Sequence, residues 1–200
     1  MNVSIIILAA GASTRMGMPK QLLMIEGKTL IRRVSEMAIE TSCHPIVVVL
    51  GANKEPIRKE IEKIPLTIIE NPKWDDGMSS SIKMGLVGAY MTHKEIDAAI
   101  FLTVDMPFVS VELINKMIKK ATEEPDNQIV ASFYENQVGI PVLFKRSVFN
   151  DLLELKGDEG AKKLVMENKD KTSLIDFPEG KFDLDTIDEY WNFVGQINQN

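Results

Sequence analysis

Residues 5–20 decide the fold, and they run Ile5-Ile6-Ile7-Leu8-Ala9-Ala10-Gly11-Ala12-Ser13-Thr14-Arg15-Met16-Gly17-Met18-Pro19-Lys20. The first half is a short apolar run, which is typical of a parallel strand buried on both faces. The second half is a loop of small residues that contains two glycines and the cations Arg15 and Lys20. Glycine lets backbone N–H groups approach a polyanion, and the two cations neutralise phosphate. The stretch therefore predicts a buried strand that leads into a phosphate-binding loop.

Two common nucleotide-binding signatures are absent from this loop. It lacks the Walker pattern Gly-x-x-x-x-Gly-Lys-Ser/Thr, and it lacks the dinucleotide pattern Gly-x-Gly-x-x-Gly. The loop thus indicates a phosphate ligand, while the reaction must be inferred from the rest of the chain.

The composition is that of an ordinary globular protein. With 200 residues, 44% of them hydrophobic and 26% charged, we expect a single domain over residues 1–200. The net charge of −6 argues against a nucleic-acid partner, because such a partner needs a basic face. Cys43 is the single cysteine, which excludes an internal disulfide and a cysteine-based zinc site. With only His44 and His93, a histidine-rich metal site is excluded as well.

The apolar runs also bear on location. None approaches the ~20 residues needed to cross a bilayer, so no membrane partner is expected. No basic segment precedes Ile5, so a secretory signal is not expected either. The expected location is the cytoplasm.

Strand-like and helix-like spacings alternate along the chain. Apolar runs predict strands at residues 46–50, 66–69, 98–104, 128–133, 141–144 and 174–177, with an extended piece at 182–185. Helical spacing predicts helices at 29–40, 54–63, 110–121 and 161–166, and helices beginning within 79–81, near 147 and at 186. This alternation implies parallel strands with right-handed crossovers in the first half. The predicted fold is a three-layer α/β/α domain with a mostly parallel, Rossmann-like sheet.

Asp105 is the most suggestive carboxylate. It closes an apolar strand, so it should lie at the carboxyl edge of the sheet, where open α/β folds bind ligands. The alternative is that it only caps the helix beginning near Ser110.

Asp183 and Asp185 are two residues apart, so they share a face if their segment is a strand. The alternative is capping of the last helix, where Thr186 and Glu189 form a capping box. Together with Asp105, these acids offer the one or two carboxylates that a Mg²⁺ site needs beside substrate phosphates. Mn²⁺ is the other candidate ion.

Ser79, Ser80 and Ser81 stand at a predicted helix start, where hydroxyls and free N–H groups are available to a ligand. For Ser81 we favour capping alone. Trp74, in the preceding polar turn, is interpreted as packing under a loop rather than as a stacking platform. For Arg15 and Lys20 phosphate contact is favoured over simple solvation, because both lie in one loop.

The ordered set of motifs resembles the nucleotidyltransferases of molybdenum-cofactor maturation, specifically the cytidylyltransferase branch. The resemblance spans nearly the whole chain. Its segments, in order, are Leu8 to Gly17 with Lys20, Asn71-Pro72-Lys73-Trp74, Gly77 to Ile82, Asp105-Met106-Pro107, Gly139-Ile140-Pro141-Val142-Leu143-Phe144, Gly157-Asp158-Glu159-Gly160-Ala161 and Asp183-Leu184-Asp185-Thr186.

The resemblance implies a fold related to GT-A glycosyltransferases and the transfer of CMP from CTP to molybdopterin, with release of pyrophosphate. It implies a nucleotide-binding part at about 1–107 and an acceptor-binding part at about 108–195. The implied catalytic residues are Arg15, Lys20, Asp105 and Asp185, of which Asp105 and Asp185 hold the metal. The implied nucleotide-binding residues are Leu8, Ala9, Ala10, Gly11, Ser13, Arg15, Lys20, Ser79 and Ser80. The implied acceptor-binding residues are Gly139, Pro141, Gly157, Gly160 and Ala161, and a molybdenum hydroxylase apoenzyme is a further implied partner.

Ala10 bears on the choice of nucleotide. The cytidylyl branch has Leu-Ala-Ala-Gly where the guanylyl branch has Leu-Ala-Gly-Gly, so Ala10 indicates CTP. A methyl group at this position would narrow the base pocket and disfavour a purine.

The chain departs from the family pattern in two places. It has Gly139-Ile140-Pro141 where the family often has Gly-His-Pro, so no histidine can act at this place in the acceptor pocket. Ile187 replaces a frequent proline after Thr186, a change without an expected effect. Other phosphorylated acceptors (a sugar phosphate or an alcohol phosphate), GTP, and a non-catalytic chaperone that delivers cofactor are therefore alternatives. The joint presence of Arg15, Lys20, Asp105 and Asp185 favours an enzyme.

Overall fold

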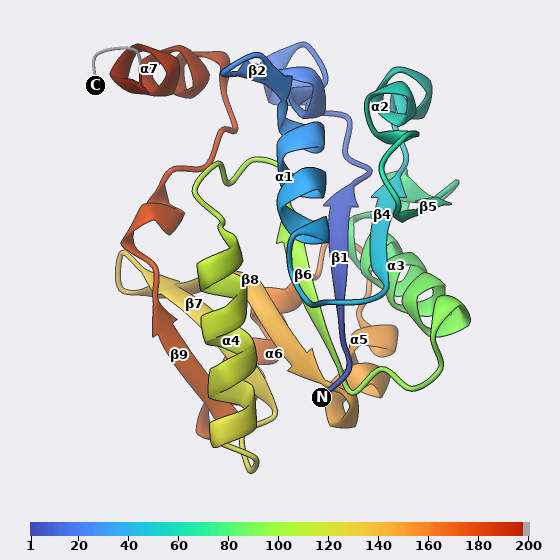
Figure 1. Ribbon diagram of the computed structural model, residues 1–200, viewed down its shortest axis with the longest axis vertical. Helices are drawn as coiled ribbons and strands as arrows, with labels where there is room; N and C mark the ends of the chain where they lie inside the picture. The colour runs from blue at the N-terminus through green and yellow to red at the C-terminus, as the bar shows by residue number, and fades with distance from the viewer. Residues whose placement is uncertain (198–200) are drawn as a thin grey trace.

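The computed structural model describes residues 1–197 and shows a seven-stranded sheet between two layers of helices (Figure 1). The strand order is β5-β4-β1-β6-β8-β7-β9. The strands are β1 (Val3–Ala9), β4 (Ile46–Leu50), β5 (Thr67–Glu70), β6 (Ala98–Thr103), β7 (Ile129–Tyr134), β8 (Gln137–Lys145) and β9 (Thr172–Asp176). Strand β8 runs antiparallel to β6 and β7, and the other pairings are parallel. A separate hairpin is formed by β2 (Met24–Ile25) and β3 (Lys28–Thr29).

The helices cover both faces of the sheet (Figure 1). On one face the core includes residues of α1 (Leu30–Ile39), α2 (Lys54–Ile61), α4 (Val111–Glu123) and α7 (Ile187–Ile197). On the other face it includes residues of α3 (Met78–Thr92), α5 (Phe149–Glu154) and α6 (Ala161–Glu167). The predicted three-layer fold is thus confirmed.

Strand β1 lies inside the sheet, between β4 and β6, and its side chains are apolar on both faces. Ile5 and Ile7 pack into one core and Ile6 into the other, and all three side chains are fully buried. Gly85 of α3 lets the helix approach this strand, since a Cβ there would lie 2.4 Å from Cγ2 of Ile6. A continuous apolar run is therefore what this position in the sheet requires.

The second half differs from the predicted pattern in two places. The strand expected at 141–144 is the end of the longer, antiparallel β8, which pairs with β7 as a hairpin. The extended piece expected at 182–185 is not a strand. It follows the short 3₁₀ helix η6 (Pro178–Lys181) and is attached to the sheet edge through one backbone hydrogen bond, from Leu184 N–H to the Asp105 carbonyl oxygen (3.1 Å).

Two predicted helix starts are confirmed. The Ser110 hydroxyl accepts the Leu113 N–H at 3.3 Å at the start of α4. Thr186 and Glu189 form the capping box of α7, with reciprocal hydrogen bonds of 2.7 and 3.3 Å. Within residues 1–197, no helix has the length and apolar character needed to cross a membrane.

Candidate active site

The first loop folds back on the end of β1 through Gln21, a residue that sequence reasoning missed. Its buried amide Nε2 donates to the carbonyl oxygens of Ala9 (3.0 Å) and Gly11 (2.9 Å). Ser13 adopts a left-handed backbone conformation (φ 55°), and its hydroxyl accepts the Lys20 N–H at 3.1 Å. A polar loop residue is normally exposed to solvent, so the sequence held no sign that Gln21 supports the loop.

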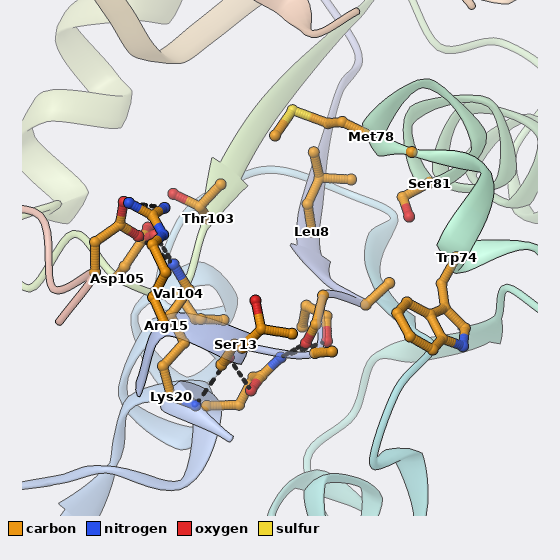
Figure 2. Close-up of a pocket in the computed structure, with 18 of the residues that line it drawn as sticks. Leu8, Ser13, Arg15, Lys20, Trp74, Met78, Ser81, Thr103, Val104 and Asp105 are labelled. Carbon is orange, nitrogen blue, oxygen red and sulfur yellow. Dashed lines mark hydrogen bonds and ion pairs between the residues drawn. The ribbon is translucent and has the colours of Figure 1, made fainter. Parts of the chain in front are cut away.

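Arg15, Lys20, Asp105 and Asp185 come together at the carboxyl ends of β1 and β6 (Figure 2). The Lys20 ammonium binds the Asp105 carboxylate and lies 2.9 Å from Oδ1 of Asp185. The Arg15 guanidinium binds the other oxygen of Asp185 at 2.6 Å. Because Leu184 is hydrogen-bonded to the Asp105 carbonyl, Asp185 is held next to a residue 80 positions earlier. We call these four residues the junction cluster.

The charges of the junction cluster stabilise one another. Burial alone would lower the pKa of the Lys20 ammonium, but Asp105 and Asp185 outweigh burial and raise that pKa. Burial also disfavours the Asp185 carboxylate, yet hydrogen bonds and charge from Lys20 and Arg15 lower its pKa. Asp183 has no ion pair with a cation of residues 1–197, and burial and the neighbouring acids raise the pKa of its carboxyl group. Lys20 is the cation that contacts both carboxylates of the cluster.

Asp105 and Asp185 fit a divalent cation. Oδ1 of Asp105 is buried and has no hydrogen-bond partner within the described part of the chain. The other Asp105 oxygen and Oδ1 of Asp185 both face the Lys20 ammonium, so one cation can reach two carboxylates. Groups of three or more metal-binding side chains do not occur within residues 1–197, so substrate phosphates and water would have to complete the shell.

A first cavity of about 490 Å³ extends from the junction cluster along the first loop. We call it the nucleotide cavity. The predicted residues Leu8, Ala9, Ala10, Gly11, Ser13, Arg15 and Lys20 all line it. Figure 2 shows Asp105, Arg15 and Lys20 on one side of this cavity and Trp74 and Ser81 on the other. The cavity therefore has a charged end and an end where an aromatic ring and a hydroxyl are available.

The serine expectations need correction. Ser81, expected only to cap, lines the nucleotide cavity, whereas Ser79 and Ser80 are not among its described lining residues. The Ser80 hydroxyl lies 2.7 Å from the Lys73 carbonyl oxygen, and the Ser79 N–H donates to Gly157 at 3.0 Å. Asn71, which sequence analysis missed as a functional residue, donates to the hydroxyls of Ser80 and Ser81. Once α3 begins at Met78, the helix geometry turns Ser81 toward the cavity.

Trp74 lines the nucleotide cavity as well as packing under a loop. It fits closely against Gly51, where a Cβ would lie 2.5 Å from the Trp74 Cβ and 2.7 Å from the Ala10 carbonyl oxygen. The predicted packing is thus present, and the indole also faces the space next to Ala10.

A second cavity of about 600 Å³ lies on the other side of the junction cluster, and we call it the acceptor cavity. Both cavities share all four cluster residues and Asp158. Of the predicted acceptor residues, Gly139, Gly160 and Ala161 line this cavity, but Pro141 and Gly157 do not. The Pro141 carbonyl accepts the Ser132 hydroxyl at 2.9 Å, and Gly157 packs against Gly77, where a Cβ would lie 2.4 Å from its backbone.

The comparison with protein families is decisive. Residues 5–172 match the model of the MobA-like NTP transferase domain. The chain belongs to this family. The matched segment includes the first loop, Asp105 and Gly139 to Ala161. This MobA-like protein is therefore a nucleotidyltransferase that uses a nucleoside triphosphate.

Two relatives show how broad the similarity is. Nicotine blue oxidoreductase of Paenarthrobacter nicotinovorans is 28% identical over 200 residues, which cover 94% of this chain and 95% of that protein. The bifunctional protein GlmU of Francisella philomiragia is 26% identical over 174 residues, 86% of this chain but only 34% of GlmU. The chain thus spans about a third of GlmU.

Solved structures agree with the fold. The structure of an Rv0371c homologue from Mycobacterium sp. strain JC1 has a TM-score of 0.84 and 26% identity, covering 98% of this chain and 97% of that one. Rv0371c of Mycobacterium tuberculosis, solved in complex with manganese, has a TM-score of 0.76 and 24% identity. The match covers 98% of this chain and 99% of that one. CMP:2-keto-3-deoxy-manno-octonic acid synthetase, solved with CTP, has a TM-score of 0.76 and 14% identity. The match covers 100% of this chain and 99% of that one. The last two, at such low identity, show a shared fold.

Proposed function

We propose that this MobA-like nucleotidyltransferase transfers CMP from CTP to the terminal phosphate of molybdopterin and releases pyrophosphate. The supporting observation is that two cavities meet at the junction cluster, so a nucleotide in one and an acceptor in the other would face each other there. The nucleotide-binding part would be about 1–107 and the acceptor-binding part about 108–195. The product, a cytosine dinucleotide cofactor, would pass to a molybdenum hydroxylase apoenzyme.

The two ends of the nucleotide cavity support one orientation of CTP. Its phosphates belong at the charged end, where Arg15, Lys20 and the loop amides neutralise them. The base then lies toward Trp74 and Ser81. Ala10 also lines this cavity, and its methyl group would narrow the base end, which would favour a pyrimidine over the larger guanine.

The chemistry asks the protein mainly for positioning and charge neutralisation. The nucleophile is an oxygen of the acceptor phosphate, whose second pKa of about 6 makes it largely dianionic at neutral pH, so no general base is required. A divalent cation held by Asp105 and Asp185, Mg²⁺ or Mn²⁺, would act as a Lewis acid on the triphosphate oxygens. The manganese found with Rv0371c supports a cation of this kind. Lys20 and Arg15 stabilise the charge of the departing pyrophosphate.

The acceptor cavity has room for more than a small phosphorylated sugar, because its volume falls within the usual range for drug-sized ligands. Gly139, Gly160 and Ala161 would bring backbone close to the acceptor. Pro141 and Gly157 would act indirectly, by fixing the neighbouring Ile140 and the loop before α6.

The similarity to nicotine blue oxidoreductase favours a second candidate function, an oxidation or reduction. Purified protein with CTP, molybdopterin and Mg²⁺ distinguishes the two, because only nucleotidyl transfer releases pyrophosphate. We expect pyrophosphate and a cytosine dinucleotide in equal amounts. Parallel reactions with GTP, a sugar phosphate and an alcohol phosphate test the alternatives, and release of pyrophosphate only with one of these would overturn the assigned substrates.

A further inference from the structure

Tyr134 is held rigidly in the acceptor cavity. It is the last residue of β7, and its ring lies between two glycines. A Cβ on Gly139 would lie 2.0 Å from the Tyr134 hydroxyl oxygen, and a Cβ on Gly180 would lie 2.4 Å from Cδ1 of the ring. The ring of Phe177 contacts it edge-on, with centroids 6.4 Å apart. The ring therefore cannot turn away from its position in the cavity.

The hydroxyl of Tyr134 has no hydrogen-bond partner among residues 1–197, although its side chain is half-buried. The contrast with Tyr190 is informative, since the Tyr190 hydroxyl donates to the Met24 carbonyl oxygen at 2.8 Å and so supports the fold. Burial, with the nearby charges of Asp183, Asp105 and Glu135, raises the pKa of Tyr134. The phenol is therefore neutral and can donate a hydrogen bond at physiological pH.

Asp183 lines the same cavity and lies near enough to Tyr134 for its charge to affect the phenol. Its carboxylate receives no side-chain hydrogen bond from residues 1–197; only its own backbone N–H bonds to it. A hydrogen-bond donor, the Tyr134 hydroxyl, and an acceptor, the Asp183 carboxylate, thus line the same cavity. The neighbouring Ile140 and Val138 supply an apolar surface for the body of a ligand.

We infer that Tyr134 and Asp183 determine which acceptor is used, by donating to and accepting from a polar edge of the acceptor. This inference rests on the proposed function and deepens it. The acceptor would be a compound with an amide-like or amino-and-carbonyl edge as well as a phosphate. Neither side chain is hydrogen-bonded to Lys20 or Arg15, the cations assigned to the phosphates, so both would act on acceptor binding rather than on the chemical step.

Tyr134→Phe tests this inference, since it removes the hydroxyl and keeps the ring in its slot. Losing one neutral hydrogen bond should raise the KM for molybdopterin roughly 3- to 10-fold. The kcat and the KM for CTP should stay within about twofold, because the nucleotide cavity is untouched. Tyr90→Phe is the matched control: Tyr90 lies on α3 beside Arg146, outside both cavities. Asp183→Asn should likewise raise the KM for molybdopterin.

An unchanged KM for molybdopterin in Tyr134→Phe would overturn the inference, as would an equal loss of kcat in that variant. The proposed function fails differently, when the wild-type protein releases no pyrophosphate with molybdopterin. In that case the same comparison is made with whichever acceptor of the panel is used, and a rise in its KM in Tyr134→Phe alone would still support the role of the hydroxyl.

Discussion

The nucleotide cavity and the acceptor cavity share the junction cluster, yet they are constructed differently. The nucleotide cavity is centred on a strand end and loop, residues 8–15, whose backbone is held by Gln21. The acceptor cavity is centred on the β7–β8 hairpin, residues 134–142, and η6 and the start of α6 also line it. One cavity is thus centred on a loop of small residues, and the other on a hairpin with larger side chains such as Tyr134 and Ile140.

This difference matches what each substrate demands. Every nucleoside triphosphate presents the same phosphates, so a short loop with two cations can serve them all. An acceptor differs from other acceptors in its body, which side chains that line the acceptor cavity, such as Tyr134 and Ile140, would contact. Changes in the junction cluster should therefore impair both substrates, while changes in one cavity should affect one substrate only.

Lys20→Met should have the largest effect, because Lys20 serves both cavities. We expect kcat/KM to fall about 1,000-fold, measured by pyrophosphate release, since the triphosphate loses its central cation. The matched control is Lys119→Met, which removes an exposed lysine on α4 paired with Glu123. A loss confined to one substrate would contradict the shared role of Lys20.

Asp105→Asn should have the next largest effect. Removing one carboxylate of the cation site should lower kcat about 100-fold and weaken Mn²⁺ binding, which can be followed by electron paramagnetic resonance without any acceptor. Asp170→Asn, at an exposed position, is the control. Unchanged Mn²⁺ binding in Asp105→Asn would exclude Asp105 as a metal ligand.

Ala10→Gly should change only the nucleotide cavity. Removing the methyl group should raise the ratio of GTP to CTP turnover about 10-fold, because one methyl group is worth about that much in a hydrophobic pocket. The KM for molybdopterin should stay constant. An unchanged ratio would show that another residue selects the base.

Glu124→Gln should have the smallest effect and should not touch catalysis. Lys120, Ser173 and Asn127 lower the pKa of Glu124 to about 2, and they join the end of α4 to β9 in the acceptor half. A lowered native pKa stabilises the protein above the unfolded value of about 4.3, and this contribution is lost as the pH falls from there toward 2. Thermal unfolding between pH 6 and pH 3 should thus show a smaller decrease in stability for the variant than for the wild-type protein. If stability fell equally with pH in the variant and in the wild-type protein, the stabilising role of the Glu124 carboxylate would be contradicted.

The local features were predictable from the sequence, and the reason is physical. The run before Ala9 is apolar on both faces, so it had to be a central strand, and the predicted strand at 46–50 is β4 without change. Arg15, Lys20 and Asp105 follow strand ends, so the edge of a parallel sheet brings them together.

The long-range features were not predictable in the same way. The direction of β8 depends on its pairing partners, and Asp185 reaches Asp105 through one backbone hydrogen bond rather than through strand alternation. Ser81, rather than Ser79 or Ser80, faces the nucleotide cavity because α3 begins at Met78, a boundary that composition did not determine. Gln21 and Asn71 resemble ordinary loop residues until their hydrogen bonds are seen.

A competition experiment tests the proposed function most directly. Purified protein receives equal concentrations of CTP and GTP with molybdopterin and Mg²⁺, and the products are identified by mass spectrometry while pyrophosphate is measured. We expect the cytosine dinucleotide to predominate and to equal the pyrophosphate released. Absence of pyrophosphate, or a predominant guanine dinucleotide, would contradict the assignment of CTP and molybdopterin to the two cavities.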